Sequence, residues 1–171
     1  KIKKGKVAAG LVVYSDRTNG SKGINSTKIM LSGAYQMPVK KSRFNFGLQA
    51  GFVRKDLSTN TFPDQFNNDS GYFDGGLATA DGGSGVNAMY FDMNLGVVYT
   101  LTGTKFRPEV GISVFHINFP KENFYGENNT LKPRPVFSFS GYWQLSPRWS
   151  LIPRVLYMYQ SGASDFIGGL Q

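Results

Sequence analysis

The segment Phe44-Asn45-Phe46-Gly47-Leu48-Gln49-Ala50-Gly51-Phe52 alternates strictly between two kinds of residue. Every second residue, starting at Phe44 and ending at Phe52, is apolar, and the residues between them are polar or glycine. Successive side chains of a β-strand point to opposite faces of a sheet, so this pattern predicts a strand with one apolar and one polar face. Helical spacing would scatter both kinds around the helix.

The same alternation recurs along the chain. From Met89 to Tyr99 an apolar set of Met, Phe, Leu, Val and Tyr opposes Asp92, Asn94 and Gly96, and Lys28 to Met37 alternates in the same way. Less regular strands are predicted at Val7 to Ser15, Phe106 to Asn118, Val136 to Leu145 and Trp149 to Gln160. This gives about seven strands, many of them near the length that crosses a bilayer at a tilt.

Short and long connections alternate between these strands. Short turns are predicted at Pro38 to Arg43, Leu101 to Lys105 and Leu145 to Arg148, and long loops at Asp16 to Thr27, Leu57 to Asn87 and Asn118 to Lys132. Outer-membrane barrels combine tight periplasmic turns with longer extracellular loops. The sequence therefore predicts an all-β, antiparallel transmembrane β-barrel of the outer-membrane type, forming a single domain over residues 1–171.

Composition excludes several other classes of protein. No run approaches the roughly 18 uncharged apolar residues of a membrane-spanning helix, so a helical membrane protein is excluded. The chain has no cysteine, which removes disulfides and thiol chemistry. The net charge of +8 could indicate nucleic-acid binding, but the basic residues are not gathered with aromatic residues on one face, and no nucleic-acid partner is expected.

Basic and acidic residues are expected at opposite ends of the barrel. The short-turn end collects Lys40, Lys41, Arg43, Lys105, Arg107 and Arg148, joined by Lys1, Lys3, Lys4 and Lys6. The long loops and outer strand ends collect Asp16, Asp56, Asp64, Asp69, Asp74, Asp81, Glu122, Glu127 and Asp165. The first six basic residues define a predicted basic rim, which suits anionic lipid head groups or an acidic periplasmic partner.

Three charged residues are predicted on the interior side of the strands. Asp92 and Glu109 should face the lumen, and Arg154 lies opposite the apolar set of its own strand, so that the three could pair there. His116, without metal-ligand spacing, is interpreted as a hydrogen-bonding residue at a strand end. No nucleophile and base, phosphate loop or carboxylate pair can be assembled. We therefore expect no enzyme, and no catalytic, cofactor-binding or metal-binding residues.

Five segments, in order, resemble the PorP/SprF family of outer-membrane components of the type IX secretion system. They are Leu11 to Gly20, Leu31 to Tyr35, Phe46 to Phe52, Val110 to Pro120 and Leu151 to Met158. The resemblance covers nearly the whole chain. It implies a non-enzymatic scaffold or anchor for secretion or gliding, which would link surface cargo or an adhesin to periplasmic parts of the machinery.

The resemblance also implies partners and an incomplete barrel. The expected partners are the lipid bilayer, lipopolysaccharide, periplasmic secretion-machinery proteins and a secreted surface adhesin. Family members are longer, begin with a signal peptide and close with a strand that pairs with the first, so further strands are expected beyond this segment. A passive porin or solute channel stays open as the alternative, favoured if the polar interior is open.

Overall fold

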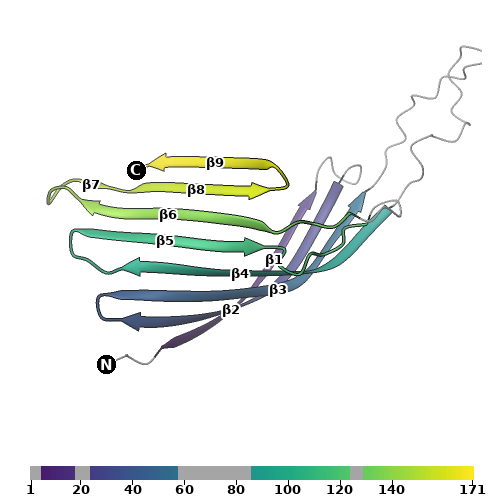
Figure 1. The fold of residues 1–171 in the computed structure, drawn as a ribbon, viewed down its shortest axis with the longest axis horizontal. Coiled ribbons are helices and arrows are strands. Elements are labelled where there is room, and N and C mark those ends of the chain that lie inside the picture. Colours follow the sequence, from purple (N-terminus) through teal and green to yellow (C-terminus); the bar gives the residue numbers. More distant parts are fainter. Residues whose placement is uncertain (1–4, 18–23, 58–85, 124–128) are drawn as a thin grey trace, which may run out of the picture.

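A computed structural model of the chain describes residues 5–17, 24–57, 86–123 and 129–171, which form one antiparallel sheet (Figure 1). Its strands are β1 (Lys6–Arg17), β2 (Ile24–Val39), β3 (Ser42–Leu57), β4 (Val86–Leu101), β5 (Phe106–Phe115), β6 (Arg134–Gln144), β7 (Ser150–Leu151), β8 (Pro153–Gln160) and β9 (Ala163–Leu170). The prediction of an all-β antiparallel fold is confirmed.

The strands follow one another across the sheet in the order β1-β2-β3-β4-β5-β6-β8-β9, with β7 paired beside β6. Each strand is antiparallel to its neighbours, as in a barrel wall built from hairpins. Within the described residues β1 and β9 form the two edges and do not pair with each other, so the sheet is open. β1 begins and β9 ends at the end of the sheet that carries the short turns (Figure 1).

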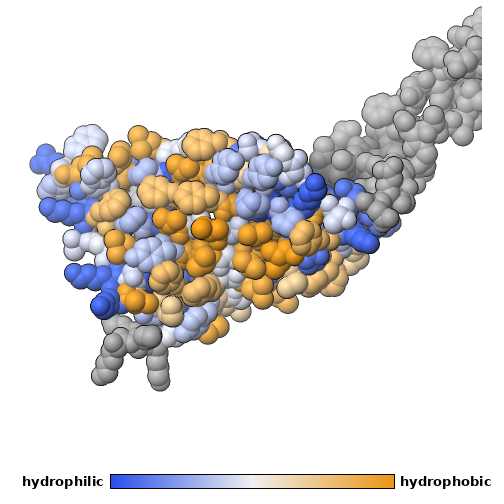
Figure 2. All heavy atoms as spheres, viewed as in Figure 1, coloured by the Kyte–Doolittle hydropathy of each residue, from blue (hydrophilic) through white to orange (hydrophobic). Residues whose placement is uncertain are grey.

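The strand register joins the apolar residues into a continuous surface. Leu48 of β3 lies opposite Leu95 of β4, and Phe52 lies opposite Phe91, with ring centroids 5.4 Å apart. We call this side the apolar face and the other side the polar face. Leu48 and Phe52 are 51% and 52% exposed, and the apolar surface is visible over the middle of the molecule in Figure 2. A monomer in water rarely leaves so wide an apolar surface bare.

The apolar face has a definite width along each strand. In β3 it covers the nine residues Phe44 to Phe52, after which Arg54 and Asp56 continue the same face. In β1 it ends at Val13, and Ser15 follows. A strand needs about 9–11 residues to cross a bilayer at a tilt, so the width of the apolar band matches a membrane crossing.

The apolar band runs obliquely to the strands. In β3 it ends at Phe44, at the level of Tyr99 of β4 and Val110 of β5, but β5 continues it to Phe106, four residues further toward the short turns. At the long-loop end, the band reaches Phe52 in β3, which lies opposite Phe91 of β4. In β5 it reaches only Val114, which lies opposite Leu95, four residues short of Phe91. Four residues correspond to roughly 13 Å. This step is expected when strands tilt against the membrane normal.

Side chains on the polar face are joined by hydrogen bonds across the strands. The Gln49 Nε2 donates to the Ser32 Oγ at 3.0 Å, and the Gln49 Oε1 accepts from the Asn94 Nδ2 at 3.1 Å. On the same face Val53 is 1% exposed and Asp92 5%. On the central strands β3 and β4 the polar face is therefore the more covered side, and the apolar face is the bare one, the reverse of a water-soluble sandwich.

The sheet differs from the sequence prediction in several details, among them the split of the strand predicted at Trp149 to Gln160 into β7 and β8. β5 ends at Phe115 and not at Asn118, because His116 adopts a left-handed φ of 59° that breaks the extended backbone. β9 was not anticipated, since its two glycines weaken the strand signal. β9 joins β8 through Ser161 and Gly162, both with positive φ, so one tight hairpin turn lies at the end otherwise assigned to long loops.

Substitution of Gly51 is expected to disrupt the pairing of β2 with β3. A Cβ at Gly51 would overlap the carbonyl oxygen of Ile29 and lie 2.7 Å from the Cα of Met30, and neither backbone atom can move without breaking the ladder. Gly51→Ala should therefore lower stability by about 1–3 kcal/mol, as overpacking does. Urea unfolding of the protein in lipid vesicles measures this. Gly33→Ala is the matched control, because no atom lies within 4 Å of its Cβ position; equal losses for both variants would contradict the prediction.

Candidate functional site

The connection that follows β5 folds back onto the polar face and binds the free edge of β4. The Ile117 backbone N–H donates to the Met93 carbonyl oxygen at 3.0 Å. The Asn118 Oδ1 accepts from the Met93 N–H at 3.0 Å, and its Nδ2 donates to the Phe91 carbonyl oxygen at 2.7 Å. The carboxamide of Asn118 therefore replaces the backbone of a neighbouring strand where β5 has already ended.

Two side-chain contacts, each with one carboxylate, hold this connection against β3 and β4. The His116 Nδ1 lies 2.8 Å from the Asp92 Oδ1, and the Asn94 Oδ1 accepts from the His116 backbone N–H at 3.1 Å. The Lys55 Nζ lies 2.5 Å from the Glu122 Oε1, and Glu122 is 5% exposed. We call residues His116–Asn123 the inner connection. Because buried carboxylates need partners, these contacts fix its position on the polar face.

The placement of Asp92 changes one expectation. Asp92 lies on the polar face, but it contacts His116 and not Glu109 or Arg154. It is eight residues from Thr100 along β4, roughly 26 Å, and Thr100 is the residue opposite Glu109. The expectation that the three predicted interior charges pair with one another is therefore wrong. His116 is a hydrogen-bonding residue directly after a strand end, as interpreted from the sequence.

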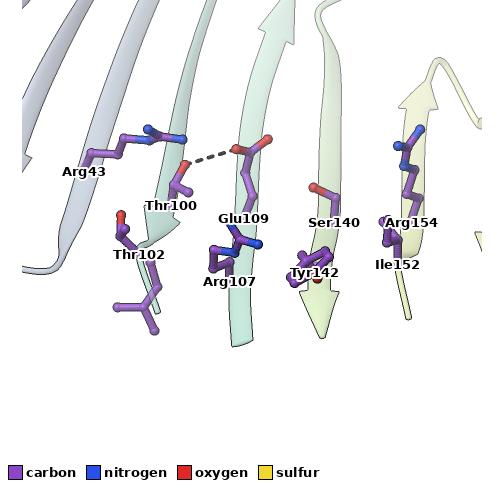
Figure 3. Close-up of a pocket in the computed structure, with 11 residues that line it drawn as sticks. Arg43, Thr100, Thr102, Arg107, Glu109, Ser140, Tyr142, Ile152 and Arg154 are labelled. Atoms are coloured by element: carbon purple, nitrogen blue, oxygen red, sulfur yellow. Dashed lines mark hydrogen bonds between the residues drawn. The ribbon is translucent and has the colours of Figure 1, made fainter. Parts of the chain in front are cut away.

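A second group of polar residues lies at the short-turn end of the same face, in one row across five strands. Arg43 of β3 faces Thr100, which faces Glu109 of β5. Glu109 faces Ser140, which faces Arg154 of β8. Together with Arg107 and Tyr142 they line an open pocket of about 410 Å³ (Figure 3). We call this the arginine pocket.

The arginine pocket carries an excess of positive charge. Its lining has three arginines, Arg43, Arg107 and Arg154, and one carboxylate, Glu109. The Thr100 Oγ1 donates to the Glu109 Oε2 at 3.1 Å, and the Arg107 Cζ lies 4.3 Å from the centre of the Tyr142 ring. Among the described residues, no arginine of the pocket lies within ion-pair distance of Glu109. The three guanidinium groups are therefore not neutralised by this carboxylate in a direct pair.

The six residues of the predicted basic rim divide into two groups. Lys40 and Lys41 form the β2–β3 turn, Lys105 precedes β5, and Arg148 lies in the turn before Trp149. The other two, Arg43 and Arg107, line the arginine pocket. All six lie at the short-turn end. Lys1, Lys3, Lys4, Asp64, Asp69, Asp74, Asp81 and Glu127 lie outside the described residues.

Sequence reasoning did not single out the neutral members of the two sites. Thr100, Ser140 and Tyr142 alternate with apolar residues in their strands, so their face could be inferred, but their positions opposite Glu109 and Arg154 depend on strand register. The Lys55–Glu122 contact joins residues that are 67 positions apart in the sequence, and no local sequence pattern predicts it.

The geometry of the sheet defines the class of protein. Within the described residues no helix is long and apolar enough to cross a membrane. A sheet with a bare apolar band of bilayer-crossing width, opposed by a face of hydrogen-bonded polar side chains, is that of a membrane-embedded β-protein.

The chain belongs to the family of type IX secretion system membrane proteins PorP/SprF, whose family model matches residues 1–170. No curated protein and no solved structure matches the chain. The resemblance found in the five sequence segments is confirmed, and the protein is a membrane component of the type IX secretion system.

Proposed function

We propose that this protein is an outer-membrane β-barrel that serves the type IX secretion system as a non-enzymatic scaffold, linking surface cargo or an adhesin to periplasmic parts of the machinery. The observation that carries the proposal is the apolar band of bilayer-crossing width on a chain that matches the secretion family over residues 1–170. Lipid and lipopolysaccharide cover the apolar face, and the lumen lies on the polar face with Asp92, Glu109 and Arg154.

The inner connection supports a scaffold over a passive porin. A porin needs an open, water-filled polar interior. Here the inner connection lies on the polar face beside β3 and β4, tied by the Asp92–His116 and Lys55–Glu122 contacts. The hydrogen-bonded side chains of Ser32, Gln49 and Asn94 fill the adjacent surface. The inner connection, held on the polar face by these contacts, obstructs the passage that free diffusion of solutes requires.

The open edges of the sheet define how the barrel is completed. β1 and β9 are exposed over their whole length, and unpaired backbone groups at such edges are costly in lipid. In this proposal residues 1–171 belong to a single barrel domain, and further strands pair with both edges. The basic short-turn end then faces the periplasm and the opposite end faces the outside.

Deletion of the gene tests the function directly. Secretion or surface display of type IX cargo should be lost, while the cargo still accumulates inside the cell envelope, and a plasmid copy should restore display. Fluorescent antibody labelling of intact cells, with immunoblots of whole cells, measures both quantities. Normal display in the deletion strain would reject the scaffold.

Charge reversal in the β2–β3 turn tests the periplasmic contact. Lys40→Glu with Lys41→Glu should reduce co-purification of periplasmic machinery several-fold, about the effect of turning attraction into repulsion at an exposed interface. Both residues are exposed and lie in a turn, so the sheet should still form. Arg54→Glu, at the opposite end of β3, is the matched control. Unchanged capture by the double variant would exclude this turn as the contact.

A further inference from the structure

The arginine pocket has the composition of a binding site for an oxyanion. Guanidinium groups present several N–H donors in one plane and match the oxygens of phosphate and carboxylate groups. Arg107 stacks on Tyr142, and stacking leaves its in-plane N–H groups available to a ligand. Ser140 and Tyr142 add hydroxyl groups from the neighbouring strand.

The position of Glu109 divides the pocket into two sides. Its hydrogen bond from Thr100 holds one carboxylate oxygen toward β4, whereas Ser140 and Arg154 lie on the other side, on β6 and β8 (Figure 3). Arg154 lies two strands from Glu109, roughly 10 Å between backbones. The side bounded by Arg107, Ser140, Tyr142 and Arg154 therefore has two cations and two hydroxyl groups, and Glu109, directly opposite Ser140, is the one carboxylate among the described residues that borders it.

We infer that this side of the arginine pocket binds a soluble, multiply charged oxyanion of the phosphate or polycarboxylate kind. The pocket opens on the polar face, so the ligand comes from water and not from the lipid that covers the apolar face. Net positive charge in the pocket and the neighbouring lysines of the short turns raise the local anion concentration. Arg107 and Arg154 hold the oxyanion from both ends, and Ser140 and Tyr142 donate to its remaining oxygens. Glu109 weakens binding by repulsion.

Isothermal titration calorimetry tests the inference with variants that should lower the affinity for the anion and one that should raise it. The full-length protein, purified in an uncharged detergent, is titrated with inorganic pyrophosphate and, separately, with citrate. Arg107→Gln and Arg154→Gln should each weaken binding about tenfold or more, since each removes charged hydrogen bonds. Glu109→Gln should tighten binding roughly three- to tenfold by removing a like charge. Added salt should weaken binding to the wild-type protein.

The matched control is Arg54→Gln, which removes the same charge from β3 eleven residues from Arg43, roughly 36 Å along the strand. Its affinity should stay within about twofold of wild type, because charges so far apart are screened. The ratio of pyrophosphate to citrate affinity identifies the kind of oxyanion. The inference is overturned if neither anion binds saturably, if Arg54→Gln weakens binding as much as Arg154→Gln, or if Glu109→Gln binds more weakly than wild type. None of these readouts depends on secretion, so a negative result leaves the scaffold proposal to its own test.

Discussion

Replacing Leu48 with arginine is expected to prevent stable insertion of the protein into the membrane. Leu48 lies at the centre of the nine-residue apolar run of β3 and is 51% exposed on the bare face. An arginine on the lipid side of a barrel strand costs about 2–4 kcal/mol at the middle of the bilayer. That cost is a large fraction of the 5–15 kcal/mol or so that stabilises a typical fold. The fraction of protein that refolds into lipid vesicles, followed by protease resistance, measures the effect.

The matched control places the same charge at nearly the same depth on the other face. Ala34 of β2 is exposed on the polar face, opposite Gly47, which is the residue before Leu48. Ala34→Arg should insert nearly as well as wild type, because its side chain points away from lipid. If both arginine variants insert equally, the apolar face of β3 is not the lipid-facing side, and the membrane assignment of the faces is wrong.

Replacing Lys55 with methionine is expected to release the inner connection. The Glu122 side chain is 7% exposed, so the variant leaves its carboxylate buried without this partner. Loss of one partner from a fully buried pair costs about 3–5 kcal/mol. Because the Lys55 side chain is 28% exposed, a smaller loss of about 1–3 kcal/mol is expected here. Urea unfolding in vesicles gives the stability, and limited proteolysis between Pro120 and Leu131 reports release of the segment.

A second variant separates the ion pair from general damage. Lys55→Met combined with Glu122→Gln removes the uncompensated charge and should recover most of the lost stability. Arg54→Met breaks the exposed Arg54–Asp56 pair one residue away and should have no measurable effect on stability.

In planar bilayers the wild-type protein should show no conductance, and Lys55→Met should show intermittent conductance. A large steady conductance of the wild type would favour the porin instead.

Local alternation was enough to predict the strands and their two faces. The period of two in Phe44 to Phe52 and Met89 to Tyr99 needs no long-range information, and both segments lie in long central strands. The short turns at Lys40–Lys41 and before Trp149 were predicted because the patterns stop there and basic or turn-forming residues follow. Family membership followed from ordered segments spread along the chain.

The contacts within the sites could not be predicted, because register and loop paths decide them. Shifting a strand by two residues keeps each face intact but would separate Glu109 from Thr100 and Ser140. His116 was assigned a strand-end role, yet the fold-back that brings its ring to Asp92 depends on a left-handed backbone angle at that residue. Charge type alone suggested that Asp92 could pair with Arg154, and distance along β4 excludes it.

Because the apolar band runs obliquely to the strands, the residues of the arginine pocket lie at different depths relative to the limit of the band. Residues directly opposite one another across tilted strands cannot lie at one depth. In β3 the band ends at Phe44, and Arg43 lies one residue beyond that limit. Beside β6 the band reaches Trp143 and its partner Leu151, and Arg154 lies three residues inside that limit. The row therefore starts at the limit of the apolar band at Arg43 and lies three residues inside that limit at Arg154. In the proposed orientation, with the short turns on the periplasmic side, an anion would reach Arg43 before Arg154.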